Sequence, residues 1–289
     1  MLKVENLSIH FEERGASQEV VRDVSFEIQD GEILGIVGES GSGKTMTALT
    51  IAGLLKNNAI LDSGSIRLDG VNLLSLSEKE MRSIQGKDIS MIFQEPMTAL
   101  NPTMRIGKQV DEALILHTGL SKEERRKKVI KALEDVELTQ PEKLCRKYPY
   151  ELSGGMRQRV MIAAAIVCRP KLLIADEPTT ALDVGTQESI LKLLKKLNKK
   201  YNMGILFISH NLRVVNELCS RVLVMKDGRV LEEGQAVQIF EHPQTEYTKE
   251  LIAAIPTRTK GSRFYELLKA RASEEGFADS DVKAGEENA

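Results

Sequence analysis

A glycine-rich loop between an apolar run and a helix-like run constrains this sequence more than any other feature. Residues 38–45 read Gly-Glu-Ser-Gly-Ser-Gly-Lys-Thr and follow the apolar run of residues 32–37. This is the pattern of a phosphate-binding loop between a strand and a helix. Glycines let the backbone curl so that several N–H groups point inward, and the helix that follows adds the positive end of its dipole. The loop therefore predicts a bound nucleoside triphosphate.

The polar positions of this loop carry the expected contacts to the nucleotide. Lys44 is spaced to reach the β- and γ-phosphates, and the Thr45 hydroxyl is spaced to hold Mg²⁺. The loop alone leaves open which kind of nucleotide-driven machine contains it. The other expected nucleotide contacts are Gly38, Ser40, Gly41, Ser42 and Gly43.

Size and composition exclude several classes of protein. The 289 residues suffice for one large α/β domain with an inserted subdomain, or for two small domains. A net charge of −2 gives no global field that recruits nucleic acid, so no nucleic-acid partner is expected. The longest uncharged apolar run, residues 160–168, is far shorter than the roughly 20 residues that cross a bilayer, and the N-terminus has no apolar signal core. These features predict a cytoplasmic protein. Cys145, Cys168 and Cys219 lack metal-site spacing and are expected to be buried.

The pattern along the chain predicts an α/β core with an insertion. Alternating runs in residues 1–35 predict strands before the loop. Amphipathic helices over about residues 103–150, one of them opened by a capping box at Ser121, predict an inserted helical subdomain. From residue 172, strands alternate with helices, which is typical of a mostly parallel, covered sheet. Residues 273–289 carry six acids and predict a disordered tail.

Shorter elements are expected between the phosphate loop and the insertion. Residues 45–55 are expected to form a helix, residues 64–70 a short strand that ends in a turn, and the charged residues 72–87 a helix.

Two acidic residues close the apolar strand that begins at residue 172. Asp176 ends the strand, where a carboxylate reaches Mg²⁺ from behind the phosphate loop. Glu177 is expected to project toward the γ-phosphate and orient the attacking water. Taken without other motifs, an ordinary polar strand end explains this pair equally well.

A second candidate anion site precedes this strand. Ser153, Gly154 and Gly155 form a small polar loop directly before an apolar helix, so a hydroxyl, glycine N–H groups and a helix N-terminus coincide. One nucleotide cannot easily use both anion sites of one molecule. We therefore expect two chains face to face, each offering its phosphate loop to one nucleotide and its Ser-Gly-Gly loop to the γ-phosphate of the other.

These motifs, in this order, resemble the nucleotide-binding subunit of an ABC transporter over about residues 1–256. The Leu-Ser-Gly-Gly run at residues 152–155 is the most specific part of the resemblance. It implies a P-loop NTPase core of the α/β class with an N-terminal antiparallel β subdomain and an inserted α-helical subdomain. Residues 257–289 would be a C-terminal extension, a helix and then the acidic tail. The resemblance also implies ATP and Mg²⁺ as cofactors and hydrolysis of ATP.

Further residues take their expected roles from the resemblance. Gln94 resembles the Q-loop glutamine, which contacts Mg²⁺ and the attacking water and joins the core to the helical subdomain. Asp183 resembles the D-loop residue that crosses the dimer interface, and His210 resembles the switch histidine at the γ-phosphate. Phe11 is the candidate for stacking on adenine, although phenylalanine is more often a core residue. The expected catalytic set is Lys44, Gln94, Glu177 and His210.

Several runs resemble one branch of the family, the ATPases of dipeptide, oligopeptide and nickel importers. Two departures matter: the branch's usual second His-Pro is Thr245-Glu246, and no cysteine follows Cys219. No iron–sulfur cluster is therefore expected, and a nickel or metal-chelate importer stays open beside a peptide importer. The runs that carry the likeness are residues 94–102, 154–162, 175–184 and 242–256.

The resemblance also implies partners and a location. It places the chain at the cytoplasmic face of the cell membrane, peripherally bound, with a second ATPase subunit, identical or related, and two membrane permease subunits. An extracytoplasmic substrate-binding protein would act indirectly. ATP would favour the closed dimer, and hydrolysis would release it. Two other classes stay as alternatives: a soluble ABC-type regulatory ATPase, which usually has two fused cassettes, and a DNA-repair ATPase, which needs a long coiled coil after the phosphate loop.

Overall fold

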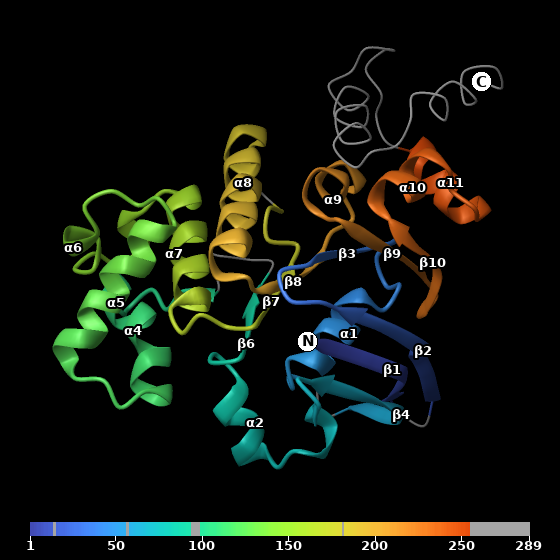
Figure 1. The fold of residues 1–289 in the computed structure, drawn as a ribbon, viewed down its shortest axis with the longest axis horizontal. Helices are drawn as coiled ribbons and strands as arrows, with labels where there is room; N and C mark the ends of the chain where they lie inside the picture. The colour runs from blue at the N-terminus through green and yellow to red at the C-terminus, as the bar shows by residue number, and fades with distance from the viewer. Residues whose placement is uncertain (14–15, 56–57, 94–98, 181, 255–289) are drawn as a thin grey trace.

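Two β-sheets and a helical subdomain make up the described part of the chain (Figure 1). The computed structural model describes residues 1–13, 16–55, 58–93, 99–180 and 182–254. One sheet has six strands in the order β10-β9-β3-β8-β7-β6, and the other has four in the order β2-β1-β4-β5. The expected α/β core with an antiparallel β subdomain and a helical insertion is confirmed.

The four-stranded sheet is the predicted N-terminal β subdomain. β1 pairs antiparallel with both β2 and β4. The alternation in β1 buries Leu2, Val4, Leu7 and Ile9 on one face, with a register shift between Val4 and Leu7. The strands are β1 (Leu2–Glu13), β2 (Ala16–Ile28), β4 (Ala59–Leu68) and β5 (Val71–Asn72).

The six-stranded sheet is parallel except for β10. Every residue of β3, β7 and β8 is buried, as fully apolar runs predict for a sheet covered on both faces. The strands are β3 (Ile33–Val37), β6 (Ile89–Ile92), β7 (Leu172–Asp176), β8 (Gly204–Ile208), β9 (Arg221–Lys226) and β10 (Arg229–Gln235). Ligands bind at the carboxyl ends of such strands, and the loops that follow β3, β7 and β8 all leave from that edge.

Alternate residues of the parallel strands build two cores on opposite faces of this sheet. Val37, Ala175 and Phe207 face the core shared with α7 and α8. Ile36 and Ile174 face the core shared with α1 and the N-terminal sheet. The helices outside the insertion are α1 (Lys44–Ile51), α2 (Glu78–Ile84), α8 (Val184–Tyr201), α9 (Leu212–Leu218), α10 (Ala236–Glu241) and α11 (Glu246–Ala253).

The inserted helices lie to the left of the parallel sheet in Figure 1 and pack on α7. The expected capping box at Ser121 is present, with Glu124 as its partner. Ile106, Val110, Leu114 and Leu133 are fully buried in the shared core. The elements are α4 (Ile106–His117), α5 (Lys122–Asp135), α6 (Pro141–Leu144), the 3₁₀ turn η2 (Pro149–Glu151) and α7 (Gly154–Ile166).

Three local expectations need correction. The helix expected to reach residue 55 ends at Ile51, because Gly53 adopts a left-handed conformation (φ 67°) just beyond it. The strand expected at residues 64–70 begins earlier, at Ala59. The single helix expected over residues 72–87 is a 3₁₀ turn (Leu73–Ser75, η1) and then α2, because a capping box at Ser77 starts a new helix.

Two further expectations concern the burial of the cysteines and the lack of a membrane-spanning segment. Cys219 is fully buried as expected, whereas Cys145 and Cys168 are only half-buried; all three are free thiols. Burial raises the pKa of both half-buried thiols. No helix within residues 1–254, as far as described, is long and apolar enough to cross a membrane. The expected C-terminal extension, residues 257–289, lies outside the described residues.

Candidate functional site

The phosphate loop joins the end of β3 to the start of α1. A side chain at Gly38 (φ 151°) would place its Cβ 2.1 Å from the carbonyl oxygen of Met225. At Gly43 (φ 96°) the same atom would lie 2.5 Å from the carbonyl oxygen of Val20. Only glycine fits the conformation and the space at these two positions. The curled backbone expected from the sequence is thus enforced by β9 and β2.

Lys44 reaches back across this loop. Its ammonium donates hydrogen bonds to the carbonyl oxygens of Gly38 (2.8 Å) and Glu39 (2.7 Å) and to the hydroxyl of Ser42 (3.2 Å). Burial lowers the pKa of Lys44, and the nearby carboxylates of Glu177 and Asp176 act in the opposite direction. The two carbonyl oxygens thus hold the desolvated Lys44 ammonium at the loop, where a bound phosphate could accept hydrogen bonds from the same ammonium.

Thr45 and Asp176 come together behind the loop, as the sequence predicts. The Thr45 hydroxyl donates to Oδ1 of Asp176 at 3.4 Å. Asp176 is 7 % exposed, and burial raises the pKa of its carboxyl group. A hydroxyl and a buried carboxylate fit Mg²⁺, which takes one or two protein oxygens and completes its shell with phosphate and water. The described residues hold no cluster of three or more His, Cys, Asp or Glu that could bind a metal ion.

Glu177 and His210 face each other at the carboxyl ends of β7 and β8. Nδ1 of His210 lies 2.8 Å from Oε1 of Glu177, and the Thr180 hydroxyl donates to Oε2 at 3.0 Å. The backbone of Glu177 is left-handed (φ 46°), and its N–H donates to the carbonyl oxygen of Ile208. An outward-turned carboxylate held by two partners suits the orientation of a water molecule.

A cavity of about 480 Å³ unites most of the predicted residues. Phe11 and Val20 line it from the N-terminal sheet, and Glu177 and His210 line it from the parallel sheet. The phosphate loop and the first turn of α1 form the rest of the lining, with Ser40, Gly41, Ser42, Gly43, Lys44, Thr45 and Met46. An aromatic ring, an anion-binding loop and a carboxylate–histidine pair therefore border one space.

Other predicted residues do not line this cavity. Ser153 caps α7 by accepting a hydrogen bond from the N–H of Met156 (3.3 Å). Asp183 caps α8 through the N–H of Thr186 (3.0 Å), and this bond lowers the pKa of its carboxyl group. A Cβ built at Gly154 meets nothing within 4 Å, whereas one at Gly155 approaches the Thr186 side chain to 3.0 Å. Gln94 lies outside the described residues.

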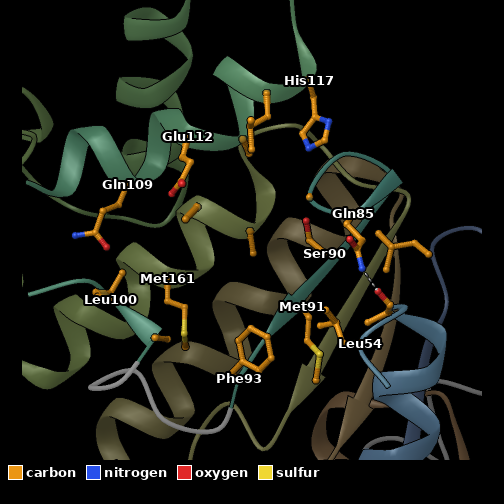
Figure 2. Close-up of a pocket in the computed structure, with 18 residues that line it drawn as sticks. Leu54, Gln85, Ser90, Met91, Phe93, Leu100, Gln109, Glu112, His117 and Met161 are labelled. Atoms are coloured by element: carbon orange, nitrogen blue, oxygen red, sulfur yellow. Dashed lines mark hydrogen bonds between the residues drawn. The ribbon is translucent and has the colours of Figure 1, made fainter. Parts of the chain in front are cut away.

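A second cavity, of about 430 Å³, lies where β6 meets the inserted helices (Figure 2). Its walls are mostly apolar, with Met91 and Phe93 on the β6 side and Leu116 on the side of α4. Polar groups border it as well, among them His117, Glu112 and Gln85. The Gln85 side chain is tied to the carbonyl oxygen of Ala52 at 2.8 Å (dashed in Figure 2). Leu116 is 71 % exposed.

Sequence reasoning missed two residues around the cavity that the phosphate loop lines. Thr180 orients Glu177, and its place three residues after Glu177 in the sequence is a local signal that could have suggested it. Tyr247 lies in α11, and its hydroxyl accepts a hydrogen bond from the N–H of Glu39 in the phosphate loop. These two residues are 208 positions apart, so no local pattern connects them.

Comparison with known proteins identifies the family. The family described as ABC transporter matches residues 21–180. The chain is 48 % identical over 258 residues to the oligopeptide transport ATP-binding protein of Bacillus subtilis, covering 89 % of this chain and 72 % of that one. It is 44 % identical to the dipeptide transport ATP-binding protein of Haemophilus influenzae, covering 93 % of this chain and 82 % of that one.

Solved structures agree. A dimeric ATP-binding cassette in a post-hydrolysis state with ADP and Pi superimposes with a TM-score of 0.72 at 32 % identity, covering 82 % of this chain and 99 % of that one. The family match spans the phosphate loop, Asp176 and Glu177, all of which border or adjoin the cavity. The chain belongs to the ABC transporter family, as one of its ATP-hydrolysing subunits.

Proposed function

We propose that this chain is the ATP-hydrolysing subunit of an importer for oligopeptides or dipeptides, bound at the cytoplasmic face of the cell membrane to separate permease subunits. The observation that carries the proposal is that the two anion-binding elements of the chain do not border the same cavity. The cavity holds a phosphate loop, Glu177 and His210, while the Ser-Gly-Gly loop at residues 153–155 caps a different helix outside it. Similarity to oligopeptide and dipeptide transport proteins supports the cargo class.

Separate residues of the cavity have separate proposed roles in ATP binding and hydrolysis. Backbone N–H groups of residues 41–45 and the Lys44 ammonium bind the phosphates, and Phe11 packs on the base. Mg²⁺, when bound to Thr45 and Asp176, would neutralise charge on the phosphates. Glu177 orients the attacking water, and His210 holds one carboxylate oxygen of Glu177.

Two chains complete two sites. Ser153 and the glycine N–H groups at the start of α7 would bind the γ-phosphate on a second subunit, identical or related, and the helix N-terminus that Ser153 caps supports this role. ATP that contacts both chains stabilises the closed pair, because its affinity for that state is higher. Loss of the γ-phosphate removes the shared contact, and the pair opens.

The second cavity is the proposed contact for a permease segment. It lies between the core and the inserted helices (Figure 2). Its apolar lining includes Leu116, whose side chain is exposed. A helix with an apolar face fits such a groove. When the dimer closes, the inserted helices would move relative to the core. A permease segment bound in the groove between them would then be displaced.

A trapped dimer tests the proposed hydrolysis. Replacing Glu177 with Gln removes the charge that orients water and keeps the side-chain size. We expect this variant to elute as a dimer with ATP and as a monomer with ADP in size-exclusion chromatography. Glu123→Gln, on the exposed first turn of α5, is the matched control and should turn ATP over normally. Full turnover by Glu177→Gln would refute the assigned role.

A second experiment tests the groove and the cargo. Leu116→Glu should abolish copurification with coexpressed permease subunits and leave the ATPase rate of the isolated chain unchanged. Leu231 is an exposed leucine on β10, and Leu231→Glu should leave copurification intact.

Uptake of labelled dipeptide or oligopeptide by the assembled importer supports the peptide assignment, whereas uptake of Ni²⁺ alone would favour the metal alternative. Capture of ribosomes or DNA in place of permeases would contradict transport.

A further inference from the structure

A hydroxyl group from α11 reaches the back of the phosphate loop. Oη of Tyr247 accepts a hydrogen bond from the backbone N–H of Glu39 at 3.0 Å. Tyr247 is only 6 % exposed and belongs to the larger hydrophobic core. Burial raises the pKa of its phenol, so the hydroxyl stays protonated at neutral pH. The contact is therefore a buried tertiary bond between a C-terminal helix and the loop.

The peptide group between Gly38 and Glu39 is held from both sides. Its carbonyl oxygen accepts a hydrogen bond from the Lys44 ammonium at 2.8 Å, and its N–H donates to Tyr247. The carbonyl and the N–H of one planar trans peptide point in opposite directions. A partner that fixes the N–H on the outer side therefore fixes the direction in which the carbonyl meets Lys44.

Tyr247 is itself held in place by β9 and β10. The Lys226 ammonium lies 4.4 Å from the centre of its ring. The carboxylate of Glu232, on β10, accepts hydrogen bonds from the N–H groups of Gln244 (2.8 Å) and Thr245 (3.2 Å), just before α11. The start of α11 is thus anchored to the sheet edge that also supports the loop.

We propose that Tyr247 is a positioning residue of the nucleotide site, which holds the Gly38–Glu39 peptide so that the loop and Lys44 are set before nucleotide arrives. The inference rests on the proposed nucleotide site at residues 38–45, and it adds a residue from beyond the matched residues 21–180. Preorganisation lowers the cost of binding. Tyr247 bonds the phosphate loop, which binds the nucleotide, rather than Glu177, which orients the water, so the effect falls on ATP affinity and KM rather than on kcat.

The test uses the full chain and a fluorescent ATP analogue. Tyr247→Phe keeps the ring, its packing and the contact to Lys226, and removes only the hydroxyl. We expect a rise of about three- to tenfold in the Kd of the analogue and in the KM for ATP, with kcat within about twofold, as loss of one hydrogen bond implies. Amide hydrogen exchange in a peptide covering residues 38–45 should speed up in the nucleotide-free variant.

Two further variants make the outcome decisive. Tyr201→Phe removes a hydroxyl that donates to Asp135, outside the cavity, and should leave Kd and KM unchanged. Glu232→Gln weakens the anchor of α11 with Tyr247 in place, and should raise both constants by a smaller factor. Two results would overturn the inference alone, provided that the unsubstituted chain binds the analogue. One is an unchanged Kd in Tyr247→Phe, and the other is an equal rise of Kd in Tyr201→Phe. Failure of the unsubstituted chain to bind the analogue would overturn the proposed site and the inference together.

Discussion

Replacing Thr180 with valine isolates the hydrogen bond that orients the expected catalytic carboxylate. The Thr180 hydroxyl donates to Oε2 of Glu177 at 3.0 Å, and His210 holds Oε1 at 2.8 Å. Valine has nearly the shape of threonine, so packing is kept. A hydrogen bond to a charged group is worth about 1.5–3 kcal/mol when both groups are buried. The Glu177 side chain is 17 % exposed and keeps its second partner, so we expect a loss of about 1–1.5 kcal/mol.

This loss should appear in turnover. It corresponds to a fall of about five- to twelvefold in kcat at saturating ATP, measured by phosphate release. KM for ATP should stay within about twofold, because the Thr180 hydroxyl bonds Glu177 and not the phosphate loop. Thr118→Val is the matched control, since its hydroxyl bonds the carbonyl oxygen of Leu114 within the helical insertion. An unchanged kcat, or a raised KM with kcat intact, would refute the reasoning.

Three further predictions concern other parts of the structure. Gly38→Ala should abolish binding of the ATP analogue, because the new Cβ would lie 2.1 Å from the carbonyl oxygen of Met225; equilibrium titration checks this, and near-normal affinity would contradict it. Phe11→Ala should weaken analogue binding by about 1–2 kcal/mol if the ring stacks on the base, whereas Phe11→Tyr should bind normally. Burial raises the pKa of Asp135, but hydrogen bonds from Lys200, Tyr201 and Lys131 outweigh it and lower that pKa below its ordinary value. Because the folded-state pKa is depressed, the carboxylate stabilises the fold above the unfolded pKa of about 3.9, and this stability is lost as pH falls through the folded value. The difference in unfolding free energy between the unsubstituted chain and Asp135→Asn, measured in urea, should therefore be largest near neutral pH and shrink below about pH 4, and a pH-independent difference would contradict this.

The phosphate loop could be predicted from sequence because its requirements are local. Gly38 and Gly43 have positive φ angles, and backbone atoms of other strands approach them closely. Both positions therefore require glycine, at a fixed spacing from Lys44. The fully apolar strands were predictable for a similar reason, since a sheet covered on both faces leaves no room for alternation. Asp176 follows because it closes such a strand.

The contacts between distant elements could not be predicted in this way. The bond from Tyr247 to Glu39 depends on how α11 is anchored on β10, and the left-handed backbone of Glu177 depends on a bond to Ile208 in the next strand. The split of the helix expected at residues 72–87 had a local signal, the Ser77–Glu80 capping box, which the sequence interpretation did not use. Tertiary hydrogen bonds, rather than local patterns, complete this site.

Complementation tests most directly whether each nucleotide site is shared between two chains, as we propose. Lys44→Ala disables the phosphate loop and leaves the Ser-Gly-Gly loop intact. Gly154→Asp places a negative charge at the Ser-Gly-Gly loop, where a Cβ meets nothing within 4 Å, so folding should be unaffected. Each variant alone should be inactive, whereas an equimolar mixture should recover roughly a quarter of the normal ATPase rate, because half of the randomly formed dimers then contain one intact site of two. If the unsubstituted chain hydrolyses ATP by itself, a mixture as inactive as its components would contradict the shared site, and so would full activity of Gly154→Asp alone.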